Sequence, residues 1–323
     1  MAVEAVGLDG FAGSSVCVVG NLNRDLKTAP IPAGAGLERD GETSVAFIAE
    51  TVGGGGANSA FAAAALGAKV SFVGKVGADA LGDRLEGALC RHGIAAHLAR
   101  DAQHASGTSL ALALASGQRH FVSCLPANQA LAFADLDLGA LAGHQHLLRA
   151  DIWFSEAMLF GGNERLLRAA RQAGLETSID LNWDPRWGHA DQAEIQRRKA
   201  AIRAILPWVT LAHGNRRELT EFAEASDLQT ALRRLTDWGV GAVVVHLGRE
   251  GAGYYENGSL VVEPPVPARR QVHATGTGDV LSVCMILLHR RTEMPICQRL
   301  HLANRVVTAF IEGRLGLIPE LAG

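Results

Sequence analysis

Short apolar runs alternate along the chain with longer segments in which apolar residues recur every three or four positions. The runs predict buried strands at 16–19, 69–73, 152–154, 177–181, 209–211 and 242–246. The longer segments predict helices at 81–92, 164–173, 193–206, 218–225, 228–238 and 280–288. Such alternation is typical of parallel βαβ units, so we expect an α/β fold with a central, mostly parallel sheet flanked by helices on both faces.

A second group of strands departs from this alternation. Strands are predicted at 44–49, 108–115 and 120–124, the last two joined by a short turn. Asn257-Gly258, inside 254–262, is a strong signal for a hairpin. No internal repeat or low-complexity linker divides the chain, so we expect a single domain over residues 1–323.

Composition and charge disfavour several classes of protein. The formal net charge is −3 and no basic cluster is interleaved with aromatic residues, so we expect no nucleic-acid partner. The apolar stretch 280–288 is far shorter than the ~20 residues of a membrane span. Glu4 and Asp9 precede any apolar run, which argues against a secretory signal and favours a cytoplasmic protein without a membrane partner. Five scattered cysteines without a C-x-x-C pair argue against a disulfide framework or a zinc cluster.

Four consecutive glycines, at 53–56, lead straight into an apolar segment that ends at Gly67. This pattern predicts a buried helix whose start lies close to a ligand, because glycine allows close backbone approach. The segment is not a Walker A loop, since no G-K-[ST] follows it. The first strand is also not followed by G-x-G-x-x-G, which weakens a nicotinamide-dependent interpretation.

The segment from Thr275 to Asp279 comes directly before the apolar helix at 280–288. The amides of Gly276, Thr277 and Gly278 can converge on one point at the positive end of that helix, which is the geometry of an anion hole. Asp279 beside it could accept the proton of a hydroxyl during phosphoryl transfer. The alternative is that Asp279 only caps a helix after a glycine turn.

Several other polar residues lie where predicted strands end. Asn215 and Glu218 could hold the water shell of a Mg²⁺ ion, or they could be the cap of an exposed helix. Asn23 and Asp25 would point to the same side of an extended segment and could meet sugar hydroxyls. Asn58 on the first turn of the buried helix and Glu156 after the strand at 152–154 could contact a ligand or serve as structural caps. His144 and His146 are interpreted as residues of a surface loop.

Taken together, these segments resemble the ribokinase family of carbohydrate kinases, often called the PfkB family. The glycine-rich G-G-x-G-A-N segment of the family is matched at 53–58, and its C-terminal signature D-T-x-G-A-G-D is matched in part at 273–279. The matches run in order from about Val16 to Arg314. They include Asn128, Asp180-Leu181-Asn182 and Leu247-Gly248.

The resemblance implies ATP-dependent phosphorylation of a sugar hydroxyl, with Mg²⁺ as cofactor, on a ribokinase-like fold with a small β-sheet lid from about 21–50 and 106–125. It also allows for a homodimer formed through the lid. The roles it implies are the following: Asp279 as base with Gly276, Thr277 and Gly278 as anion hole; Asn23, Asp25, Gly54, Asn58 and Glu156 around the sugar; Asn215, Glu218, His246, Gly248, Gly251 and Asn304 around the nucleotide and Mg²⁺, with Glu218 near the metal through water.

The chain departs from the family pattern at several positions. His246 stands where the family commonly has Thr, and Gly55 replaces a Lys of the ribose-specific branch, which argues against ribokinase itself. Pro126 replaces a glycine. His273 and Ala274 replace the usual Asp and Thr of the signature. Because an imidazole lacks the negative charge with which that Asp helps to bind a monovalent cation, we expect an enzyme largely indifferent to K⁺.

Three alternatives concern the acceptor and the activity. A nucleoside kinase on the same fold would need aromatic stacking, for which the lid offers little beyond Phe47 and Phe121. Arg24, Lys27 and Arg119 in or near the lid leave room for an acidic sugar, since Arg binds a carboxylate bidentately. A catalytically silent relative that senses a sugar or nucleotide is disfavoured because the residues of the signature's base and anion hole are present. We therefore expect a small sugar or sugar acid as the acceptor.

Overall fold

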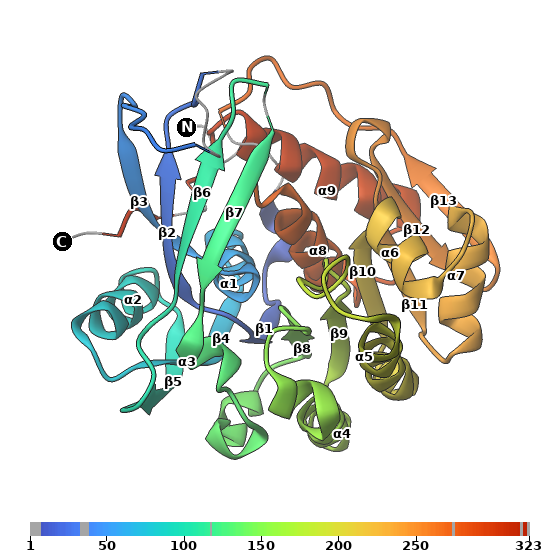
Figure 1. The fold of residues 1–323 in the computed structure, drawn as a ribbon. Helices are drawn as coiled ribbons and strands as arrows, with labels where there is room; N and C mark the ends of the chain where they lie inside the picture. Colours follow the sequence, from blue (N-terminus) through green and yellow to red (C-terminus); the bar gives the residue numbers. More distant parts are fainter. Residues whose placement is uncertain (1–7, 33–38, 117, 273–274, 317–318, 322–323) are drawn as a thin grey trace.

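The computed structural model describes residues 8–32, 39–116, 118–272, 275–316 and 319–321. These residues form a large sheet between two layers of helices, with a small second sheet beside it (Figure 1). Among the helices described, none is long and apolar enough to cross a membrane.

The large sheet has nine strands in the order β13-β12-β11-β10-β9-β8-β1-β4-β5. The seven strands from β11 to β5 are parallel, whereas β12 and β13 join the edge as an antiparallel hairpin. Their bounds are β1 (Ser15–Val19), β4 (Lys69–Gly77), β5 (Ala95–Asp101), β8 (His146–Arg149), β9 (Glu176–Asp180), β10 (Leu211–Asn215), β11 (Ala242–His246), β12 (Ala252–Glu256) and β13 (Ser259–Glu263).

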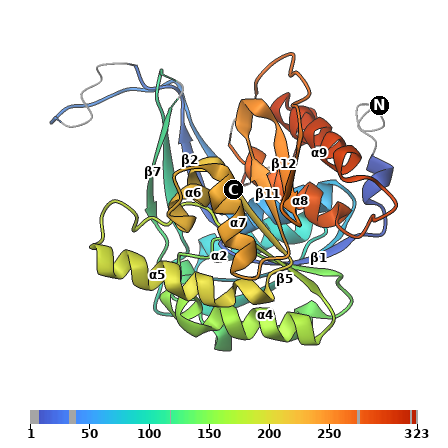
Figure 2. The same ribbon diagram turned by 90° about the vertical axis from the view of Figure 1, so that its right-hand side faces the viewer.

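Helices cover both faces of this sheet. Helices α1, α2, α8 and α9 contribute to one hydrophobic core, and α4, α5, α6 and α7 contribute to the core on the other face (Figure 2). The helices are α1 (Gly55–Ala65), α2 (Ala80–Arg91), α3 (Pro126–Gln129), α4 (Asn163–Gln172), α5 (Gln192–Ile205), α6 (Arg216–Ala223), α7 (Leu228–Asp237), α8 (Thr277–Leu288) and α9 (Ile296–Ile311). Shorter turns are η2 (Leu8–Phe11), η3 (Phe133–Asp135), η4 (Leu138–Leu141), η5 (Met158–Gly162), η6 (Leu206–Trp208) and η7 (Gly248–Glu250).

Helix α8 is apolar on all sides because it is enclosed on all sides. It packs on α1, α9, β10 and β11, and every residue from Val280 to Leu288 is buried. A helix with this pattern belongs inside a protein. Burial fixes its first turn in place, and that turn carries Asp279 and the predicted anion hole.

The small sheet has the order β3-β2-β6-β7, with β2 (Asn23–Thr28), β3 (Ile48–Gly53), β6 (Thr108–Ala113) and β7 (Arg119–Cys124). The pairs β2–β3 and β6–β7 are antiparallel, and β2–β6 is parallel. We call this sheet the lid. It stands beside the large sheet at the same end as the start of α8, as expected from the resemblance (Figure 1).

The structure corrects several expected elements. Residues 152–154 are not a strand, because the strand is β8, which starts at His146, and the chain turns at Asp151 with a φ of 52°. His144 and His146 are therefore buried rather than part of a surface loop. The strand expected at 44–49 starts only at Ile48, and that expected at 209–211 is β10, which continues to Asn215.

The parallel strands diverge in order on either side of β1 and β8. Chain order runs outward from β1 through β4 to β5, and from β8 through β9 and β10 to β11. The gap between the carboxyl ends of β1 and β8 is thus a topological switch point, where open α/β sheets bind their ligands. The glycine loop and Asp151 lie there.

Candidate active site

Helix α8 begins without a side-chain cap. Gly276 occupies the N-cap position in the left-handed region, with a φ of 86°, and as a glycine it has no side chain that could bond to the amides that follow it. Asp279 stands in the first turn, and the side-chain bond of its carboxylate goes to Asn58 of another helix. The amides of the first turn remain available to an anion, and the helix dipole favours negative charge at this point.

Asp279 lies in that first turn and is tied to helix α1. The side-chain Nδ2 of Asn58 donates a hydrogen bond of 2.9 Å to Oδ2 of Asp279. Burial raises the pKa of Asp279 to about 7, although the bond from Asn58 opposes this shift, and the negative charges of Asp151 and Glu218 raise the pKa further. A carboxylate with this pKa takes up a proton readily near neutral pH, as a general base must.

The four-glycine loop packs tightly against the end of β1. A Cβ on Gly54 would lie 2.3 Å from the carbonyl oxygen of Asn21, and a Cβ on Gly56 would lie 2.7 Å from Cα of Gly20. Gly54 also has a φ of 101°, which favours glycine. The loop therefore needs glycine at both positions for steric reasons.

Asp151 holds this loop in place, although sequence reasoning did not single it out. Its buried carboxylate accepts hydrogen bonds from the amides of Asn21 at 2.8 Å, Gly55 at 3.2 Å and Gly56 at 2.8 Å. Burial nevertheless raises its pKa, because the three amides and Arg149 offset the burial only in part. The signal that could have found it is its place after β8, which the sequence did not reveal as a strand.

Asn23 and Asp25 lie at the base of the lid and contact each other. Nδ2 of Asn23 donates to Oδ1 of Asp25 at 2.9 Å, and burial raises the pKa of Asp25. Gly53 on β3 pairs with Asn23, and a Cβ on this glycine would lie 2.0 Å from Oδ1 of Asp25. Asn128 is close by: its Nδ2 donates to the carbonyl oxygen of Leu22, and its buried Oδ1 has no hydrogen-bond partner among the described residues. The lower end of the lid therefore offers several side-chain groups that can form hydrogen bonds with hydroxyls.

Asn215 and Glu218 form a capping box at the start of α6. Oδ1 of Asn215 accepts from the amide of Glu218 at 2.9 Å, and Oε2 of Glu218 accepts from the amide of Asn215 at 2.8 Å. The capping interpretation is therefore right as far as it goes, but the carboxylate is not on an exposed helix face. Burial raises the pKa of Glu218, because the carboxylate is poorly hydrated.

Asp180, at the end of β9, is buried and completes a group of acids with the half-buried Glu218 and Asp279. Its pKa is raised well above the usual range, first by burial and then by the charges of Asp279 and Glu218. None of these three carboxylates makes an ion pair within the described ranges. They do not by themselves form a ready metal cluster, since no group of three His, Cys, Asp or Glu side chains in the described part of the chain is arranged to hold an ion. A Mg²⁺ ion that keeps most of its waters fits uncompensated buried charge of this kind.

A cavity of about 660 Å³ opens on the other side of the α8 terminus. Thr277 and Gly278 of the predicted anion hole line it. All four residues assigned to the nucleotide apart from the capping box line it as well: His246, Gly248, Gly251 and Asn304. Its volume is within the usual range for a small-molecule site.

Two of these residues have evident structural bonds. The Nε2 atom of His246 lies 3.0 Å from Oγ of Ser282 on α8, and burial lowers the pKa of His246 to about 4, so the ring is neutral at pH 7. Nδ2 of Asn304 donates to the carbonyl oxygens of Glu263 at 3.0 Å and Pro264 at 2.9 Å. Asn304 thus fixes the wall of the cavity, while its Oδ1 is not used by those bonds.

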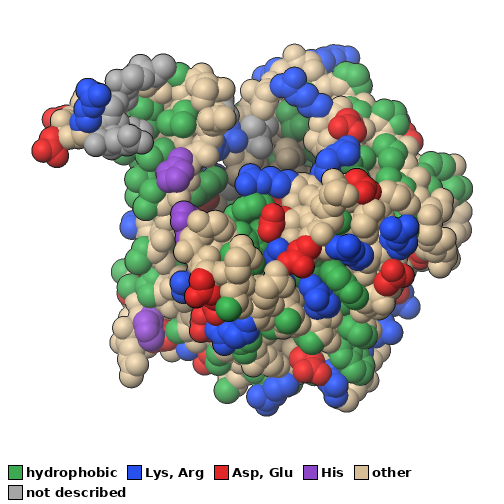
Figure 3. All heavy atoms as spheres, turned by 45° about the vertical axis from the view of Figure 1, so that its right-hand side comes forward, with side chains coloured by type: hydrophobic (Ala, Val, Ile, Leu, Met, Phe, Trp, Pro, Cys, Tyr) green, Lys and Arg blue, Asp and Glu red, His purple; other side chains and the backbone are tan. Residues whose placement is uncertain are grey.

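The cleft between the lid and the body is visible as a hollow in the molecular surface (Figure 3). Not all predicted residues join this cleft. The Glu156 side chain is 59% exposed, and its nearest ionic partner is Arg198 at 3.8 Å, so no contact links it to Asp279 or Asn58. His273 and Ala274, on which the expectation about K⁺ rests, lie outside the described residues.

Comparison with known proteins gives a consistent result. The model of the pfkB family carbohydrate kinases matches residues 14–294. A ribokinase of Arabidopsis thaliana is 25% identical over 314 residues, which cover 94% of this chain and 78% of the relative.

Solved structures share the fold. A fructokinase from Xylella fastidiosa with bound ATP superposes with a TM-score of 0.78 at 18% identity, over 94% of each chain. A protein from E. coli, solved with ATP and Mg²⁺, gives a TM-score of 0.76 at 19% identity, again over 94% of each chain. With a family model that spans most of its length and a ribokinase-like fold, this chain belongs to the pfkB family of carbohydrate kinases.

Proposed function

We propose that this protein is an ATP-dependent kinase that transfers the γ-phosphoryl group to a hydroxyl of a small sugar or sugar acid. The observation that carries the proposal is the position of Asp279. Its carboxylate is bonded to Asn58 on the lid side, and Thr277 and Gly278 of the same helical turn line the large cavity on the other side. A base between two binding spaces, beside an anion hole, is what phosphoryl transfer between two small molecules requires.

In the proposed reaction, Asn23 and Asp25 orient the acceptor and Asp279 accepts the proton of the attacking hydroxyl. The hydroxyl oxygen forms a bond to the γ-phosphorus of ATP while the bond from that phosphorus to the bridging oxygen of ADP breaks. The amides from Gly276 to Gly278 stabilise charge on the transferred group through hydrogen bonds and the dipole of α8. The proton on Asp279 then passes to solvent.

Mg²⁺ fits the acids beside this centre, of which Asp180 is buried and Glu218 half-buried. Glu218, together with Asn215, would hold the ion through its water shell, and Asp180 would add to the negative potential. When bound, the ion would neutralise charge on the phosphates of the nucleotide. The proposal places the nucleotide in the 660 Å³ cavity, against His246, Gly248, Gly251 and Asn304.

The decisive experiment is a coupled assay of ADP release with MgATP over neutral sugars, sugar acids and nucleosides. We expect turnover with at least one sugar or sugar acid, and no turnover with Asp279→Asn. The absence of turnover with every acceptor, combined with tight binding of a sugar or nucleotide in calorimetry, would instead identify a silent sensing relative.

A nucleoside acceptor is the second candidate, and one observation favours it. Phe47 and Phe121 both line a smaller cavity beside the lid, where a nucleobase could stack on them. Higher kcat/KM for a nucleoside than for any sugar, lost on Phe121→Ala, would establish this alternative.

The proposal includes a homodimer formed through the lid. Ile48 and Val122 lie on the lid face opposite to Asp25, and both are more than half exposed. Strand β7, at one edge of the small sheet, is exposed along its length. An exposed edge strand with apolar neighbours favours association. Sedimentation should show a dimer that Val122→Lys dissociates.

A further inference from the structure

A second cavity, of about 310 Å³, lies between the lid and the segment that leads into helix α8. Thr275, two residues before the start of that helix, lines one side of it. The opposite side is formed by lid residues, among them two cations, Lys27 and Arg119. The cavity is separate from the 660 Å³ space that the proposal gives to the nucleotide.

Strand register places these two cations on the face of the lid that carries the acceptor residues. Along β2, side chains alternate between the faces, so Asn23, Asp25 and Lys27 share one face. Lys27 is paired with Ala111 on β6, and Ala111 is paired with Phe121 on β7. Arg119 is two residues from Phe121 and therefore faces the same way. The lid thus presents amide, carboxylate and cation in order along one surface.

The cation on the opposite face of the lid, Arg24, is already paired. Arg24 lies between Asn23 and Asp25 in sequence but points away from the cleft, where it pairs with Glu50 at 3.5 Å and donates to Oγ1 of Thr108 at 3.2 Å. The expectation that Arg24 could serve an acidic acceptor together with Lys27 and Arg119 is therefore wrong. Its charge is already compensated by the lid itself.

Lys27 and Arg119 differ from Arg24 in this respect. Neither makes an ion pair with a carboxylate in the described part of the chain. Partial burial lowers the pKa of Lys27, the charge of Asp25 opposes that shift, and the nearby charge of Arg119 adds to it. Asp25 is engaged by Asn23 at 2.9 Å rather than by Lys27. Two like charges that converge on one concave space favour an anion between them, since each then gains a charge-assisted hydrogen bond.

We infer that the acceptor carries an anionic oxygen group, which Lys27 and Arg119 bind at the end remote from the hydroxyl that is phosphorylated. The inference rests on the proposed kinase function and narrows its substrate class. A carboxylate or a phosphate ester would supply the same chemistry. Lys27 lies four residues along the strand from Asn23, or about 13 Å, so an extended five- or six-carbon chain with contacts at both ends would span the space.

The test compares acceptors that share a carbon skeleton and differ in charge. ADP release is measured with neutral aldoses of five and six carbons, with the corresponding aldonates and 2-keto-3-deoxyaldonates, and with the aldose phosphates. We expect kcat/KM for one anionic class to exceed that for its neutral counterpart at least tenfold. The aldonate and phosphate arms then identify which anion the site takes. A neutral aldose that equals or exceeds both anionic classes would overturn the inference.

Variants test the two cations. Lys27→Met and Arg119→Met should each raise KM for the preferred acid about 10- to 100-fold, as expected for a lost bond to a charged group. KM for ATP should stay within about twofold of the wild type. Arg24→Met, which removes a cation from the same strand on the opposite face, is the matched control and should leave KM for the acid nearly unchanged. An unchanged KM in the double variant of Lys27 and Arg119 would overturn the inference.

Calorimetry separates this inference from the proposed function. If no acceptor is phosphorylated, the kinase proposal fails, and binding of gluconate and glucose 6-phosphate to the wild-type protein decides the inference alone. Anion binding that the double variant loses and Arg24→Met keeps supports the anion site. Failure of both probes to bind, with or without MgATP present, overturns it.

Discussion

The two ends of the large sheet both carry buried or partly buried carboxylates, and the protein treats them in opposite ways. At the carboxyl end, the pKa values of Asp180, Glu218 and Asp279 are raised, because burial is not matched by nearby cations. At the amino end, the pKa of Glu176 is lowered, although burial would raise it. The difference lies in what surrounds each acid.

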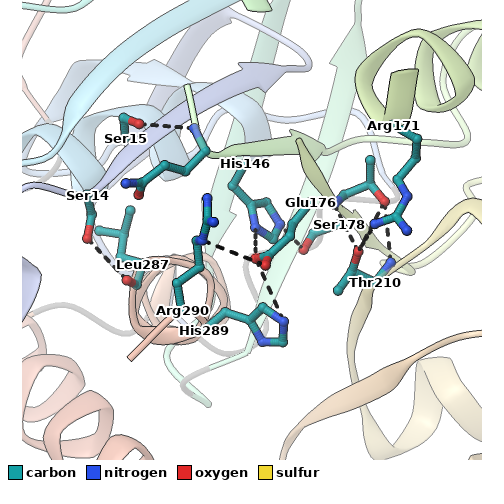
Figure 4. A network of polar contacts seen from close by, with 12 residues as sticks. Ser14, Ser15, His146, Arg171, Glu176, Ser178, Thr210, Leu287, His289 and Arg290 are labelled. Carbon is teal, nitrogen blue, oxygen red and sulfur yellow. Dashed lines mark hydrogen bonds and ion pairs between the residues drawn. The ribbon is translucent and has the colours of Figure 1, made fainter. Parts of the chain in front are cut away.

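Glu176, at the start of β9, is surrounded by basic groups (Figure 4). Its Oε2 lies 3.5 Å from Nδ1 of His146 and 3.7 Å from Nε2 of His289, and Oε1 lies 3.9 Å from Nε of Arg290. His146 is also held by Ser178, whose Oγ lies 2.6 Å from Nε2 of the ring. These residues come from β8, β9 and the end of α8, so the network joins the sheet to that helix.

In the proposed function, the start of α8 serves the chemistry, whereas its end contributes to stability. Glu176, whose pKa is lowered by its surroundings, lowers the energy of the folded state at neutral pH. Acids left without cations cost stability. In the proposed function, this cost is relieved when Mg²⁺ or a proton binds to them. Substitutions of these acids should therefore separate effects on activity from effects on stability.

The largest effect is expected for Asp279→Asn. Loss of a positioned general base should lower kcat by about 10² to 10⁴. The apo protein should not lose stability at pH 8. A carboxyl with a folded pKa of about 7 favours folding below its unfolded pKa, and this contribution is lost as the pH rises through 7. Asparagine cannot ionise, so the variant avoids the cost of a buried negative charge at pH 8.

Initial rates and thermal melting of the same preparation test this prediction. A variant that keeps more than about a tenth of the wild-type kcat would remove Asp279 from the role of base, because the loss would be smaller than that of a general base. For the wild type, kcat/KM should rise with pH through about 7 as Asp279 ionises.

Asp25 extends the contrast to the lid, since burial raises its pKa too. Asp25→Ala should weaken acceptor affinity about 10- to 100-fold, because a charged partner of a hydroxyl is worth about 1.5 to 3 kcal/mol. Affinity for MgATP should remain close to that of the wild type. Calorimetry with each ligand measures both, and equal weakening of the two would contradict the assignment.

How far the sequence predicts the structure differs between elements for physical reasons. β11 matches its expected range residue for residue, because its valines are buried on both faces of a parallel sheet and form a continuous apolar run. β8 could not be found this way. It starts with His146 and ends with Arg149, whose polar groups are buried only because Ser178 and Asn163 meet them. β2 and β5, in which polar residues interrupt the apolar run, and helix α9 were not predicted.

The residues of the candidate site also differ in how far the sequence predicts them. The glycine loop and the start of α8 depend on local backbone geometry, and glycines in the sequence mark such geometry directly. Asp151 acts on residues 95 and 130 positions away, so no local pattern reveals its role. The direction of Arg24, away from the cleft, follows from strand pairing, which the sequence alone did not supply.

Glu176→Gln should affect stability and spare activity, the reverse of Asp279→Asn. We expect a loss of about 1 to 2 kcal/mol in the free energy of unfolding at pH 7, because one charged partner of a partly buried network is removed. The kcat should stay within about twofold of the wild type. Denaturant titration and rate measurements check both, and a kcat loss above tenfold would break the comparison between the two ends.

Acid should weaken the contribution of the buried histidines to the stability of the wild-type protein. Burial lowers the pKa values of His144 and His246 to about 4 and also lowers those of His146, His213 and His289. Their contribution is present above the unfolded pKa of about 6.5 and is lost as the pH falls towards the folded values. Glu176 acts in the same direction below about 4.5. The raised pKa values of Asp180, Glu218 and Asp279 act in the opposite direction over this range, so the histidine effect is tested by the difference between two proteins. The free energy of unfolding of His213→Leu, taken relative to that of the wild type, should rise as the pH falls from 7 to 5.

The smallest effect is expected for Glu218→Gln. Glutamine can still accept the bond from the amide of Asn215, so the capping box and the start of α6 should be preserved. What is lost is the negative charge, which a cation held through water needs nearby. We expect the Mg²⁺ concentration for half-maximal rate to rise several-fold, with little change in melting temperature. Glu221→Gln on the same helix, whose carboxylate pairs with Lys199 at 3.0 Å, is the matched control and should leave the Mg²⁺ titration unchanged. If Glu218→Gln also leaves the Mg²⁺ titration unchanged, Asn215 and Glu218 serve only to start the helix. The acids that could then attract Mg²⁺ at this end of the sheet would be Asp180 and Asp279.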